Sequence, residues 1–152
     1  MKVAIGTDHA GFDLKERLKR ELVALGLEVV DVGTTSTEPV DYPDFCFPVG
    51  EMVARGEVAC GIVLGGSGIG ESIAANKVVG VRASVVTSDE TARLTRLHND
   101  SNVLALGGRT TADFDDAVRW MRIWLDTPFE GGRHIARLKK IHDYETAHAV
   151  RA

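Results

Sequence analysis

Short apolar runs alternate with helical repeats of apolar residues along the whole chain. The apolar runs predict five strands, near residues 3–6, 27–32, 60–64, 82–86 and 103–106. Apolar residues spaced three or four apart predict six helices, over about 14–25, 44–54, 72–77, 88–98, 114–125 and 133–148. Gly26 is a plausible end of the first helix, and residues 34–43, rich in Thr, Ser and Pro, are predicted to form a loop.

Strands that alternate with helices are typical of α/β proteins. Five of them predict a three-layer, doubly wound, Rossmann-like parallel sheet with helices on both faces and a C-terminal helix. Neither an internal repeat nor a long linker divides residues 1–152, so one domain is predicted. Ligands bind such sheets at the carboxyl ends of the strands. Polar side chains follow the first, third and fifth strands at these ends. Three such groups favour a ligand-binding site over ordinary polar loops.

Composition limits the classes of function. The formal net charge of −4 argues against a nucleic-acid binder that relies on bulk electrostatic attraction. We find no apolar run long enough for a membrane span and no signal peptide, so a cytoplasmic protein is expected. The two cysteines, Cys46 and Cys60, make neither a disulfide framework nor a zinc motif, and Cys60 is expected to pack inside a strand.

A glycine-rich turn is the most informative motif. Residues 65–71, GGSGIGE, follow an apolar strand and lead into a predicted helix. Backbone N–H groups at such a turn, at the positive end of a helix dipole, form an anion site. Ser67 and Glu71 supply its only reactive side chains, so Glu71 is a candidate base. The alternatives are a tight turn that needs glycine and a glutamate that merely caps the helix.

Three further groups could carry chemistry or could be structural. Asp8-His9 could be an acid–base pair or the cap of the next helix, and His98 could donate a proton or only cap a helix end. Arg133 and Arg137 share one helix face in a segment without acids. Together with Arg109 they suit a phosphate dianion, although an exposed basic face is the simpler alternative.

Cofactor motifs are weak in this chain. Asp89 and Glu90 lie at a suitable distance beyond the turn to meet a ribose, but the glycines do not follow G-x-G-x-x-G. A Gly-Lys-Ser/Thr P-loop is missing, and no His, Asp or Glu cluster has the spacing of metal ligands. Chemistry without a metal or cofactor is therefore predicted.

The ordered set of motifs resembles the type B ribose-5-phosphate isomerases, in the family that also holds galactose-6-phosphate isomerase. It covers nearly the whole chain: Gly6-x-Asp8-His9-Ala10-Gly11, Asp41-Tyr42-Pro43, the 65–71 turn with Ala74-Ala75-Asn76-Lys77, His98-Asn99-Asp100, Gly107-Gly108-Arg109 and Arg133-His134-x-x-Arg137. The resemblance implies a metal-free interconversion of ribose 5-phosphate and ribulose 5-phosphate, a pentose phosphate step, through a cis-enediolate. It also implies a homodimer, or a dimer of dimers, with active sites shared between chains.

The resemblance also assigns roles. Glu71 would be the base that moves a proton between C2 and C1, Ser67 would help hold the enediolate, and Asp8 and His98 would assist ring opening. The substrate would be bound by His9, Tyr42, Gly66, Gly68, Gly70, Asn99, Arg109, Arg133 and Arg137. Many members carry a cysteine base where this chain has Gly65, so the chain resembles the branch that uses a glutamate.

Two other functions stay open at this stage. The substrate could be another aldose phosphate, such as allose or galactose 6-phosphate or a four-carbon sugar phosphate. The chain could also be a non-catalytic phosphosugar-binding module, although that role would need only the arginines and the turn.

Overall fold

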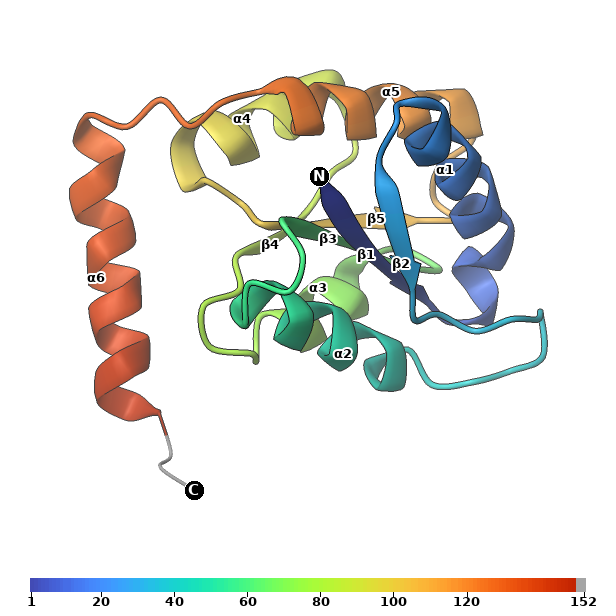
Figure 1. Cartoon of the computed structure of the whole chain (residues 1–152), viewed down its shortest axis with the longest axis horizontal. Coiled ribbons are helices and arrows are strands. Elements are labelled where there is room, and N and C mark those ends of the chain that lie inside the picture. Colours follow the sequence, from blue (N-terminus) through green and yellow to red (C-terminus); the bar gives the residue numbers. More distant parts are fainter. Residues whose placement is uncertain (150–152) are drawn as a thin grey trace.

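The computed structural model describes residues 1–149 and has one five-stranded parallel sheet with the strand order β2-β1-β3-β5-β4 (Figure 1). Its strands are β1 (Lys2–Thr7), β2 (Glu28–Asp31), β3 (Cys60–Gly65), β4 (Ala83–Val85) and β5 (Val103–Gly107). Its α-helices are α1 (Phe12–Ala24), α2 (Pro43–Ala54), α3 (Ile69–Ala75), α4 (Asp89–Asn99), α5 (Phe114–Asp126) and α6 (Arg133–His148). The predicted strands and helices are all present, so the α/β class is confirmed.

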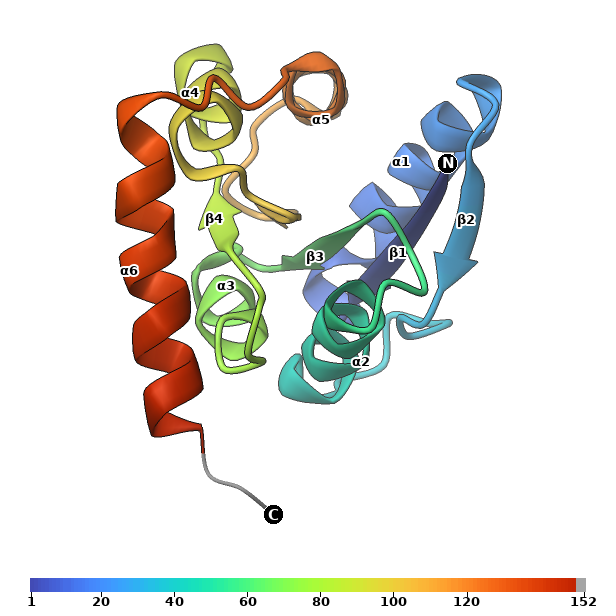
Figure 2. The same ribbon diagram turned by 60° about the vertical axis from the view of Figure 1, so that its left-hand side comes forward.

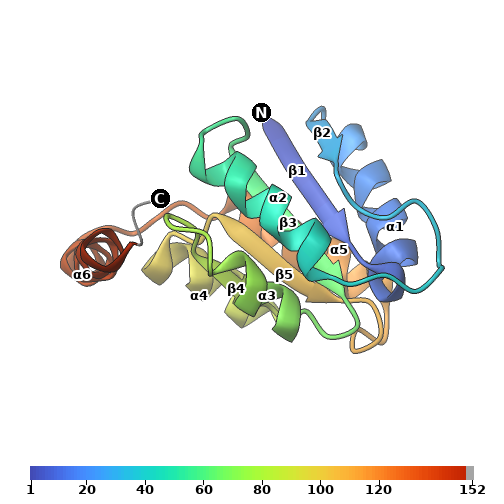
Figure 3. The same cartoon turned by 90° about the horizontal axis from the view of Figure 1, so that it is seen from below.

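Helices cover both faces of the sheet, as Figure 3 shows from below. On one face α1, α4 and α5 pack over a core that includes the fully buried Leu14, Leu18 and Leu22. On the other face α2 and α3 enclose a second core around Val49 and Ala75. Each fully buried leucine stabilises the fold by about 1.5–3 kcal/mol relative to an exposed one, which explains why the leucine repeat fixes α1 against the sheet.

The sheet brings the carboxyl ends of its three central strands to one edge. Thr7 of β1 is in register with Leu64 of β3, and Gly65 of β3 with Gly107 of β5. The chain turns from β1 to β2 on one side and from β3 toward β4 and β5 on the other. Such a reversal opens a crevice beside β1 and β3, where ligands bind in doubly wound sheets.

Helix α6 stands apart from this layered body, beside the β4 edge of the sheet (Figure 2). It touches α4 near its start, and Leu138 and Ile141 line a groove against Val81 and Ala83. Among its described residues only His134 is buried, and Ile135 remains 57% exposed. A search of residues 1–149 finds no helix long and apolar enough to cross a membrane.

Candidate active site

The glycine turn joins β3 to α3 in a conformation that requires glycine. Gly68 has φ +79°, in the left-handed region, and a Cβ there would lie only 3.0 Å from the Leu106 carbonyl carbon. The turn can therefore end abruptly, and α3 begins at Ile69, three residues before the predicted start. Ser67 Oγ accepts a hydrogen bond from the Ile69 N–H at 3.2 Å. N–H groups in the first turn of a helix have no carbonyl partner within the helix and favour a negatively charged group.

The loop after β5 holds this turn from the side. The Gly108 N–H donates to the Gly65 carbonyl at 2.7 Å, and the Arg109 N–H donates to the Gly66 carbonyl at 3.0 Å. Arg109 also packs beside the turn, since its Cδ lies 3.7 Å from the position of a Cβ on Gly66. The predicted approach of Arg109 to the turn is thus present, with the guanidinium exposed on the rim.

Glu71 fills the space that Gly65 leaves empty. A Cβ built on Gly65 would overlap Oε1 of Glu71, and the glutamate is only 4% exposed. A side chain at position 65 and the carboxyl of Glu71 therefore compete for the same volume. The absence of a side chain at residue 65 therefore gives the Glu71 carboxyl its place.

The surroundings of Glu71 suit a base. Burial raises the pKa of its carboxyl above the ordinary value, and the charge of Asp8 raises it further. Backbone N–H groups of Glu71 and Gly68 act in the opposite direction. The outcome is a poorly solvated carboxylate with a raised pKa, which is the state that abstraction of a carbon-bound proton requires.

Asp8, His9 and Tyr42 lie around the same edge. Asp8 Oδ1 accepts from the Ala10 N–H at 2.9 Å and caps a short 3₁₀ helix (His9–Gly11), which is one of the two roles considered for it. His9 Nδ1 accepts the N–H of Val40 at 3.2 Å, which leaves Nε2 as the atom that can donate to a ligand. Tyr42 packs on the turn, its Cζ 2.7 Å from the position of a Cβ on Gly70.

Cys46 is a neighbour of the site that the sequence pattern did not indicate. Burial and the charges of Glu71 and Asp8 raise the pKa of its thiol to about 12. Burial likewise raises the pKa of Cys60 to about 11, and Cys60 packs inside β3 as predicted. Both thiols are therefore neutral at physiological pH and are unsuited to act as nucleophiles.

The structure does not bring His98, Asn99, Arg133 and Arg137 to Glu71. His98 and Asn99 end α4, just before β5 starts, so they lie at the amino-terminal edge of the sheet. Arg133 and Arg137 are exposed on α6, beside the β4 edge. In Figure 1 helices α4 and α6 lie toward the left, whereas β1 and β5 run toward the right. Within one chain, the predicted residues therefore form two separate groups.

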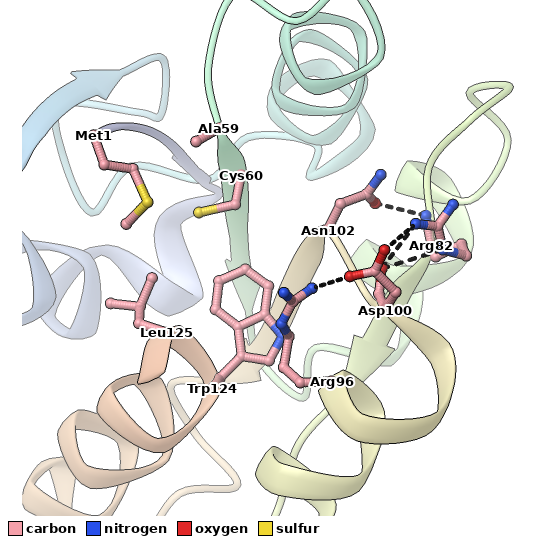
Figure 4. A pocket seen from close by; sticks show the side chains of 9 residues that line it. All are labelled: Met1, Ala59, Cys60, Arg82, Arg96, Asp100, Asn102, Trp124 and Leu125. Carbon is pink, nitrogen blue, oxygen red and sulfur yellow. Dashed lines mark hydrogen bonds and ion pairs between the residues drawn. The ribbon is translucent and has the colours of Figure 1, made fainter. Parts of the chain in front are cut away.

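The end of α4 is held by an ion-pair clamp (Figure 4). Asp100 adopts φ +44°, an uncommon value for a residue other than glycine, and its carboxylate meets Arg96 at 2.8 Å and Arg82 at 3.5 Å. A hollow of about 250 Å³ opens between this clamp and Trp124. Because both guanidinia are already engaged, we assign the clamp a structural role: it fixes the position of His98 and Asn99.

Comparisons with known proteins agree with this arrangement. Residues 3–141 match the family model described as Ribose/Galactose Isomerase. The protein named ribose-5-phosphate isomerase B of Escherichia coli (strain K12) is 46% identical over 140 residues, which cover 92% of this chain and 93% of the relative.

Solved structures give the same result. Ribose-5-phosphate isomerase B of Clostridium thermocellum has a TM-score of 0.95 and 48% identity, covering 98% of this chain and 100% of that one. The enzyme of Mycoplasma genitalium with bound ribulose-5-phosphate has a TM-score of 0.91 and 38% identity, covering 95% and 96%. The chain described here is a member of the ribose/galactose isomerase family.

Proposed function

We propose that the protein interconverts ribose 5-phosphate and ribulose 5-phosphate. The proposal rests on the buried carboxyl group of Glu71, which packs against Gly65 beside the glycine turn. Relatives with 40–46% identity over most of the chain are named ribose-5-phosphate isomerase B. A binding module without catalysis would not need a buried base.

The proposed reaction is a proton transfer between two carbons. Glu71 takes the proton from C2 of the open-chain aldose, so that electrons move into a C1–C2 double bond and the C1 oxygen becomes an enediolate oxygen. The protonated Glu71 then returns its proton to C1, and the proton of the C2 hydroxyl passes to the C1 oxygen, which gives the ketose. N–H groups of the turn and Ser67 stabilise the developing negative charge, as in an oxyanion hole.

We further propose that a second copy of the chain completes each site. Ring opening needs an acid–base group near the turn, and the sugar phosphate needs cations at its far end. His98, Asn99, Arg133 and Arg137 could supply these functions, but within one chain they lie away from the turn, at the end of α4 and on α6. In a twofold dimer these segments of one copy can face the turn of the other, giving two equivalent shared sites.

Charge and apolar surface support this assembly. The α6 helix presents Arg133 and Arg137 on one exposed face and carries the exposed Ile135 and Ile141 elsewhere. These apolar side chains have little to cover them within the chain, and a docked copy would bury them. His9 and Arg109 would then meet the phosphate from one chain, and the two arginines of α6 from the other.

Replacing Arg137 by Ala is expected to raise KM for the sugar phosphate and to weaken inhibition by inorganic phosphate. The lost binding free energy should be ~1.5–3 kcal/mol, which is the contribution of a hydrogen bond to a charged group. Steady-state kinetics measure it directly. Lys139→Ala is the matched control, since residue 139 is two positions further along α6 and lies on nearly the opposite helix face. Equal effects of the two substitutions would show that the helix face with Arg133 and Arg137 does not bind the phosphate.

The proposed reaction is tested with a panel of sugar phosphates. Purified protein, treated with EDTA, is assayed with four-, five- and six-carbon aldose phosphates. We expect the highest kcat/KM with ribose 5-phosphate. Preference for allose or galactose 6-phosphate would reassign the substrate, and tight binding of every sugar without turnover would indicate the binding module instead.

A further inference from the structure

Three side chains converge where the end of α4 meets the segment that leads from α5 into α6, away from the glycine turn. His98 comes from the end of α4, Glu130 from the segment between α5 and α6, and His134 from the first turn of α6. His134 Nε2 lies 3.0 Å from Glu130 Oε2, and His98 Nε2 lies 3.9 Å from the same oxygen. One nitrogen or oxygen of each residue lies within 4.8 Å of the others.

The cluster is partly preformed by packing. The imidazole rings of His98 and His134 are stacked, with centroids 4.4 Å apart and planes 18° from parallel. His134 is buried, whereas Glu130 is exposed and lines a hollow of about 260 Å³ together with residues 131–134. One ligand is thus held by the fold, and the exposed carboxylate leaves a path by which an ion can enter.

Two imidazoles and one carboxylate form a donor set that suits zinc. Zn²⁺ is commonly held by three protein ligands of this kind, with a water molecule in the fourth position. Bonds of about 2.0–2.1 Å in a tetrahedron place the ligand atoms roughly 3.4 Å apart. The distances of 3.0 and 3.9 Å on either side of Glu130 lie near this value. Because an imidazole binds a metal in its ring plane, the stacked rings must rotate out of parallel for both Nε2 atoms to point at one ion.

We propose that His98, Glu130 and His134 bind one Zn²⁺ ion per chain and that this ion inhibits the isomerase. The inhibitory part rests on the proposed function, in which His98 assists ring opening in a neighbouring site. A ring nitrogen bonded to zinc cannot exchange a proton with the sugar. The metal also joins the end of α4 to the start of α6, and so restrains the helix that carries Arg133 and Arg137.

Binding is tested without substrate. Metal-free protein competes with a chromophoric chelator for added Zn²⁺, and we expect one bound ion per chain. Affinity should fall roughly tenfold or more in Glu130→Gln and in His134→Asn, since each removes a ligand. His142→Asn removes a histidine of α6 outside the cluster and should bind like the wild type. Binding that is absent, or equal in all variants, overturns the site. Because Glu130 is exposed, its variant decides the matter even where the buried His134 variant fails to fold.

Inhibition is tested separately with ribose 5-phosphate. Zn²⁺ should inhibit the wild type reversibly, with activity restored by EDTA, and the concentration for half inhibition should rise in Glu130→Gln in parallel with the lost affinity. Stoichiometric binding without inhibition overturns the inhibitory role and leaves the metal site. Protein that binds zinc but isomerises none of the sugars refutes the proposed function and the inhibition that rests on it, and the binding result still stands.

Discussion

The Glu71→Gln variant is expected to lose about two orders of magnitude or more in kcat, while KM changes little. Glutamine keeps the shape of the side chain over Gly65 but cannot accept the proton from C2, and general-base catalysis contributes roughly 10²–10⁴-fold. Because the turn and the cations are untouched, substrate binding is retained. Steady-state kinetics of the purified variant give both constants. Near wild-type turnover would show that another group is the base.

The same variant should be more stable than the wild type at neutral pH. Burial raises the pKa of the Glu71 carboxyl in the folded state, so the ionised form is disfavoured by folding. Below the pKa that Glu71 has in the unfolded chain, the carboxyl is protonated in the folded and the unfolded state, and it does not lower the stability of the fold. As pH rises through the higher pKa of the folded state, the folded protein must hold a buried charge, and its free energy of unfolding falls. Thermal unfolding at several pH values measures this. A variant less stable than the wild type at neutral pH would mean that hydrogen bonds in the folded protein fully offset the burial of the Glu71 carboxylate.

Gly65→Ala is expected to reduce activity about as strongly as Glu71→Gln, although Glu71 is still present. The new methyl group occupies the position of Oε1, so the carboxyl must turn away from the reacting carbons. Since the displaced group is the end of a flexible side chain, the fold survives the change. Displacements near 1 Å can cost about 10²-fold in rate. Kinetics and circular dichroism are measured on the same preparation.

Gly66→Ala is the matched control for that substitution. A Cβ at Gly66 meets its nearest atoms, in Arg109 and Ala10, at 3.7 and 3.8 Å, which is ordinary van der Waals contact. We expect it to retain far more activity than Gly65→Ala. If both alanine variants lose the same activity, the turn is sensitive to any side chain, and the particular position of Glu71 over Gly65 does not matter.

The sequence pattern predicted the fold because local and tertiary preferences agree in this chain. The leucines of α1 lie at helical spacing and are fully buried, and α4 covers the predicted range closely, with Ser88 as its N-cap. Boundaries were less accurate at the glycine turn, because the left-handed conformation of Gly68 allows α3 to start directly after it. Periodicity does not indicate such a backbone conformation.

The site was predicted only in part. Asp8, His9, Glu71 and Arg109 lie at one edge because a parallel sheet brings the carboxyl ends of its strands together, and the alternation of strands and helices along the chain predicts such a sheet. The separation of His98 from Glu71 follows from the direction of α4, which returns to the opposite edge of the sheet. The cluster of His98 and His134 with Glu130 was not predicted, because its members come from three segments that only folding brings together.

The central claim is that each active site combines the glycine turn of one chain with His98 of another, and complementation tests it most directly. Glu71→Gln and His98→Asn chains, each inactive alone, are mixed, unfolded and refolded together. Random pairing gives about half heterodimers, in which one site is intact and the other carries both defects. About a quarter of wild-type activity should therefore return. No recovery, despite heterodimers confirmed by mass, would show that each site is built within a single chain.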